Sequence, residues 1–280
     1  MPLSILLPLM LQIGPGGALP QAPLAIPKKK SETVVQPKTD AAKTHSDLLQ
    51  ECLRLAMTRP ADAIEVAENW RAKAKTAQDR AGANQCHALA LTRLEGWAQA
   101  APLFLAARED TPASEADERA RLAALAGNAS LAAQDPTGAL TALDLASADS
   151  AKGSDARLRS AIEVDRAAAF VALNRPVDAA AALTAARTAD PANAEAWLLS
   201  ATLSRRQGDL ATAQGQIEKA AELLPVDPEI GLEAGVIAML LGRDEAARKS
   251  WQSVITAAPG SAAAQTARGY LDQLGTAATP

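Results

Sequence analysis

Small, bulky and proline positions recur along this chain in a pattern that predicts paired helices. Between residues 160 and 261, four sets of positions hold the same kind of residue at a spacing of 34. The sets are Ala167, Ala201 and Gly235; Ala179, Ala213 and Ala247; Leu183, Ile217 and Trp251; and Pro191, Pro225 and Pro259. A period of roughly 20–50 residues is the signature of stacked structural repeats. Each unit can hold two helices, and the proline stops the second because it has no backbone N–H to donate.

The expected helix ends also carry specific residues. Asn174, Gly208 and Gly242 share the same spacing, at the point where the first helix of a unit should finish. Asparagine and glycine tolerate the left-handed backbone conformation that ends many helices. Pro60, Pro136 and Pro176 should begin the second helix of their units, since a missing N–H has no cost in a first turn.

The pattern therefore predicts an all-α fold without a β-sheet. The units lie at 44–77, 81–114, 120–153, 160–193, 194–227 and 228–261. Residues 262–274 form one more amphipathic helix. A single hairpin cannot bury its apolar side, so several must stack. We expect a solenoid of about six helical hairpins plus a C-terminal capping helix across residues 44–275, followed by a flexible tail at 276–280.

The best-preserved unit supports a specific resemblance. Residues 194–227 hold Trp197, Ala201, Gly208, Ala213, Ile217, Ala220 and Pro225 at the positions that define it. On these columns the chain resembles the tetratricopeptide repeat (TPR) family over residues 44–261. The resemblance implies an α–α superhelix. The first helix of each repeat would line a concave groove that binds another protein or a peptide.

The resemblance also implies which side chains face that groove. The candidate set is Thr92, Arg93, Arg121, Asn128, Leu198, Thr202, Arg205, Arg206, Leu232, Val236 and Met239. We expect Arg205 and Arg206 to anchor an acidic or carbonyl-rich part of an extended or helical segment. The alternative is that both arginines pair with Glu195, Glu229 or Glu233 and hold nothing else.

Two histidines and two cysteines lie in the first helices of the first two units: His45, Cys52, Cys86 and His87. His45 and Cys52 would be about 10 Å apart along a helix, too far for one zinc ion. We expect no metal site. For Cys52 and Cys86 two interpretations stay open. They are small buried core residues, or they form a disulfide between neighbouring helices, which export to an oxidising compartment would permit.

The first 43 residues differ in composition from the repeats. An apolar run at 3–13 precedes glycines, a proline and small residues, as in a secretory signal, although no Lys or Arg comes before it. The run is shorter than the roughly 20 residues of a membrane span. We expect a signal peptide at 1–22, cleaved after Ala18 or Ala22, and a disordered Pro/Lys-rich linker at 23–43. The protein would be periplasmic or secreted; the alternative is cytoplasmic, with a merely disordered N-terminus.

Charge and motifs narrow the function. The formal net charge is −4, and residues beyond the lysine-rich start carry −7, which argues against nucleic-acid binding. No phosphate loop, nucleophile elbow or metalloprotease motif occurs, and we expect no cofactor. The sequence predicts a non-catalytic scaffold with a protein or peptide partner, organising a bacterial cell-envelope complex. The alternatives are a cytoplasmic TPR adaptor and, in another class, an all-α enzyme with a closed pocket of convergent polar groups.

Overall fold

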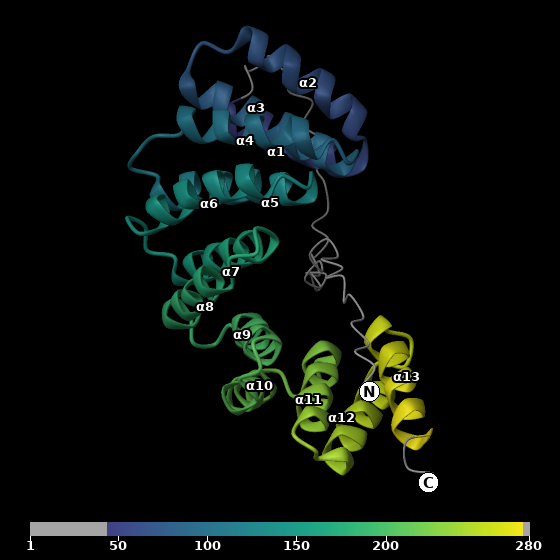
Figure 1. The fold of residues 1–280 in the computed structure, drawn as a ribbon. Coiled ribbons are helices and arrows are strands. Elements are labelled where there is room, and N and C mark those ends of the chain that lie inside the picture. Colours follow the sequence, from purple (N-terminus) through teal and green to yellow (C-terminus); the bar gives the residue numbers. More distant parts are fainter. Residues whose placement is uncertain (1–43, 277–280) are drawn as a thin grey trace, which may run out of the picture. The chain divides into compact units, whose positions relative to one another are not determined.

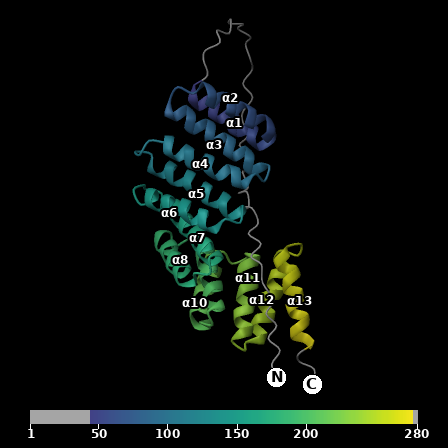
Figure 2. The ribbon, with the colours of Figure 1, turned by 45° about the horizontal axis from the view of Figure 1, so that its top comes forward.

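The computed structural model describes residues 44–276, and this part of the chain folds into 13 helices without a strand, as the repeat pattern predicts (Figures 1 and 2). The expected signal peptide, the linker and residues 277–280 lie outside the described residues. The helices are α1 (His45–Thr58), α2 (Pro60–Lys73), α3 (Ala77–Arg93), α4 (Trp97–Asp110), α5 (Ala116–Ala132), α6 (Pro136–Ser150), α7 (Ala156–Ala172), α8 (Pro176–Ala189), α9 (Ala194–Arg206), α10 (Leu210–Leu223), α11 (Pro228–Leu240), α12 (Asp244–Ala257) and α13 (Ala262–Thr276).

The helices stack in chain order as six hairpins and a final single helix. Within this unit each helix packs on its neighbours in sequence, and most odd-numbered helices also contact the next odd-numbered one, as α1 with α3 and α5 with α7 (Figure 1). The even-numbered helices make no comparable contacts with one another in the described part of the chain. The odd-numbered helices thus form one layer of the solenoid and the even-numbered helices the other.

The turns between the two helices of a hairpin use the backbone conformation that the sequence predicts. Asn174, Gly208 and Gly242 have φ angles of 55°, 84° and 72°. Glu95 and Gln134 occupy the same place in earlier hairpins, with φ of 59° and 61°. All five residues lie in the left-handed region, where residues other than glycine and asparagine are uncommon. Three of the second helices, α2, α6 and α8, begin with proline, also as expected.

Glycines let the two helices of a hairpin approach closely. A Cβ atom added at Gly235 in α11 would lie 2.1 Å from the indole nitrogen of Trp251 in α12. One added at Gly127 in α5 would lie 2.5 Å from Leu143 in α6. The bulky residue of each pair therefore fits over a missing side chain in its own hairpin. Sequence analysis identified these columns as small and bulky, and the structure shows that they pack against each other.

Replacing Gly235 with alanine is expected to destabilise the protein by about 1–3 kcal/mol, because the new methyl group must displace the fully buried Trp251. Gly215 in α10 provides a matched control, since an added Cβ there meets nothing within 4 Å. Gly215→Ala should instead stabilise the helix by about 0.5–1 kcal/mol. Denaturant unfolding measures the free energy of unfolding of both variants. Equal values for the two variants would contradict the packing of α11 on α12.

The last helix closes the stack. Ala263, Ala264 and Ala267 of α13 are buried against the α12 core, and the ring of Tyr270 lies 5.1 Å from the ring of Trp251. The remaining side of α13 carries exposed polar residues. Helix α13 therefore covers the last hairpin of the described residues, as the sequence predicts.

The first hairpin is joined to the second by a covalent bond. The Cys52 and Cys86 sulfur atoms form a disulfide between α1 and α3, with the two Cα atoms 5.9 Å apart. Both residues are fully buried in a cluster otherwise made of alanines and Leu55. Of the two interpretations left open by the sequence, the disulfide holds, and its sulfurs also serve as core atoms.

A buried ionic network joins α4, α5 and α6. The Arg108 guanidinium donates to the Asp149 carboxylate at 2.7 Å, and both side chains are more than nine-tenths buried. Arg119 of α5 lies 3.6 Å from the same carboxylate and donates to the backbone oxygens of Arg108 and Thr111. Charges enclosed to this degree are held only when paired and hydrogen-bonded.

Candidate partner-binding face

Polar side chains bridge α5 to α7 and α9 to α11. The Asn128 amide of α5 donates to the Asp165 carboxylate of α7 at 3.0 Å. The negative charge of Glu195 on α9 acts on Asp165 from the next helix. Arg205 of α9 donates to both oxygens of Glu233 on α11, at 2.6 and 3.2 Å. We call the surface of α3, α5, α7, α9 and α11 that carries these side chains the odd-helix face.

All four expected groove residues on α3 and α5 are at least partly open to solvent. Arg93 and Asn128 are exposed, and Thr92 is half-buried with its hydroxyl donating to the Leu89 carbonyl. Arg121 is exposed but forms an ion pair with Glu118 one turn earlier on α5. Its charge is therefore already partly neutralised within its own helix.

On α9 the two arginines have different surroundings. Arg205 forms the ion pair with Glu233 that sequence analysis gave as its alternative, and both side chains are largely buried. Arg206 is exposed, and no ionic partner for it occurs among residues 44–276. Leu198 and Thr202 are half-buried on the same helix. The structure thus pairs Arg205 with Glu233 across α9 and α11 and leaves Arg206 open to solvent.

On α11 the expected apolar anchors are used by the fold. Leu232, Val236 and Met239 are half-buried and pack against the cluster that α13 shares with Trp251. Sequence analysis placed them in the groove because it could not show which side chains the last helix covers. Their main role in the structure is to seat the C-terminal cap.

Asp165 is the most perturbed acid on the odd-helix face, and sequence analysis did not select it. Its burial raises the pKa to about 6, the hydrogen bond from Asn128 lowers the pKa, and the charge of Glu195 raises it. Val164, the preceding residue on α7, is buried in the core. No repeat column or motif in the sequence distinguishes Asp165 from the other acidic residues.

Replacing Asp165 with asparagine is expected to stabilise the protein near neutral pH. An acid whose pKa is higher folded than unfolded destabilises the fold when ionised, here at pH values above about 6. This cost disappears as the pH falls below 3.8, because the carboxyl group then becomes protonated in both states. The free energy of unfolding of Asp165→Asn should exceed that of the parent by about 1–2 kcal/mol at neutral pH.

The same comparison should show little difference at about pH 3, because protonation has then removed the charge from the parent protein in both its folded and its unfolded state. Denaturant titrations at both pH values measure the two differences. Glu218→Gln, which removes an exposed carboxylate from α10, is the control and should change little at either pH. A variant less stable than the parent at neutral pH would contradict the assigned burial of Asp165.

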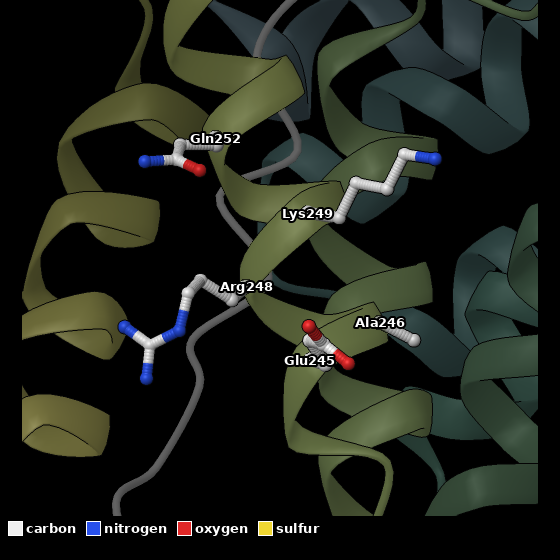
Figure 3. Close-up of a pocket in the computed structure, with 5 residues that line it drawn as sticks. All are labelled: Glu245, Ala246, Arg248, Lys249 and Gln252. Carbon is white, nitrogen blue, oxygen red and sulfur yellow. The ribbon is translucent and has the colours of Figure 1, made fainter.

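Two surface hollows were considered as sites for chemistry. The first is lined by Glu245, Ala246, Arg248, Lys249 and Gln252, all on α12. Figure 3 shows Arg248 and Gln252 pointing to one side of this helix and Lys249 to the other, so their polar groups do not converge. The second hollow lies between α7 and α8, where Arg166 is paired with Glu163 and Asp144. Neither hollow assembles a set of free titratable groups.

Among residues 44–276, no group of three or more histidine, cysteine, aspartate or glutamate side chains could hold a metal ion. No helix in the same range combines the length and apolar character needed to cross a bilayer.

Comparison with known proteins supports the fold assignment. No protein family profile and no curated protein sequence matches the chain. Solved structures do match. PilW, a type IV pilus biogenesis factor, is 19% identical with a TM-score of 0.61, over 78% of this chain and 97% of PilW. Pseudomonas aeruginosa PilF is 14% identical with a TM-score of 0.59, over 81% of this chain and 100% of that one. YrrB, a TPR protein with an unusual peptide-binding site, is 19% identical with a TM-score of 0.50, over 67% and 91%.

The 34-residue period, the paired helices and these likenesses together define the fold. The chain has the fold of a TPR-type helical solenoid.

Proposed function

We propose that this chain is a non-catalytic scaffold that binds a protein or peptide segment along the odd-helix face. The observation that carries the proposal is that Arg93, Asn128 and Arg206 present exposed polar groups on three odd-numbered helices. Thr92, Arg93, Arg121, Asn128, Leu198, Thr202 and Arg206 would contact the segment. YrrB, which has a comparable fold and a peptide-binding site, supports this use of the solenoid.

The proposal includes a location in the cell envelope. A disulfide buried between two helices persists in an oxidising compartment and is rare in a reducing cytosol. PilW and PilF, with similar folds, add support through the pilus biogenesis role of PilW. Mass spectrometry of the native N-terminus tests the location: cleavage after Ala18 or Ala22 supports export, whereas an intact start would favour a cytoplasmic adaptor.

Binding along the odd-helix face can be tested with the full-length protein and a displayed library of random peptides. Thr202→Tyr places a larger side chain on the odd-helix face. Thr212→Tyr makes the same change at an exposed position of α10, in the other layer. Peptides selected on the parent should bind Thr202→Tyr much more weakly and Thr212→Tyr normally. Equal binding to both variants would place the site elsewhere and overturn the proposal.

A further inference from the structure

We draw no further inference here: the strongest candidate, the surface of α4, α6 and α8 in the even-numbered layer, whose exposed side chains are mostly alanine and threonine, is a face of small residues, and nothing in the structure shows what covers it.

Discussion

Replacing Asp149 with alanine is expected to destabilise the protein by about 3–5 kcal/mol, the largest effect of any single substitution considered for this chain. The substitution leaves the Arg108 guanidinium enclosed at the junction of α4, α5 and α6 without its main carboxylate. The neighbouring Glu109 can compensate only partly, because its side chain is 68% exposed. Chemical denaturation monitored by far-UV circular dichroism measures the loss.

A matched control distinguishes the effect of breaking a buried ion pair from the effect of breaking an exposed one. Arg59 and Asp62 form an ion pair with side chains 68% and 52% exposed, and Asp62→Ala should cost no more than about 1 kcal/mol. The double change Arg108→Met with Asp149→Leu should recover most of the stability, because no unpaired charge then remains buried. A similar loss for Asp149→Ala and Asp62→Ala would show that the network is solvated and contributes little.

Removing the disulfide by Cys52→Ala and Cys86→Ala together is expected to cost about 3–4 kcal/mol, from the entropy that a 34-residue closed loop removes from the unfolded chain. The effect should be local. The first hairpin of the described residues has a small core, since α2 buries only Ala63 and Ala67. Its helices should open while distant hairpins stay folded, since repeats interact only with their neighbours.

Hydrogen exchange with mass spectrometry measures this localisation. Amides of α1 and α2 should lose protection in the double variant, while those of α9 to α12 keep the protection of the parent. A reducing agent should reproduce the change in the parent protein and do nothing further to the variant, which is the control for indirect effects. Unchanged exchange in α1 and α2 would show that packing alone holds the first hairpin.

The sequence by itself determined the helices, their pairing in hairpins and the capped end. These features depend on interactions within a few residues, such as the left-handed turn at Asn174 and the proline that starts α8. They recur every 34 residues, so each repeat confirmed the others. The separation of Cys52 from Cys86 equals this period, which agrees with their positions on the adjacent odd-numbered helices α1 and α3.

Only the tertiary structure decided which charges are free. Arg205 and Arg206 are neighbours in sequence, yet one pairs with Glu233, 28 residues away, and the other faces solvent. Asp165 meets Asn128 across 37 residues. These separations match no single period, because they depend on how far each helix is turned and shifted against the next. The packing of neighbouring helices therefore decides which of two similar side chains is paired within the fold and which is open to solvent. The repeat pattern alone does not specify this packing.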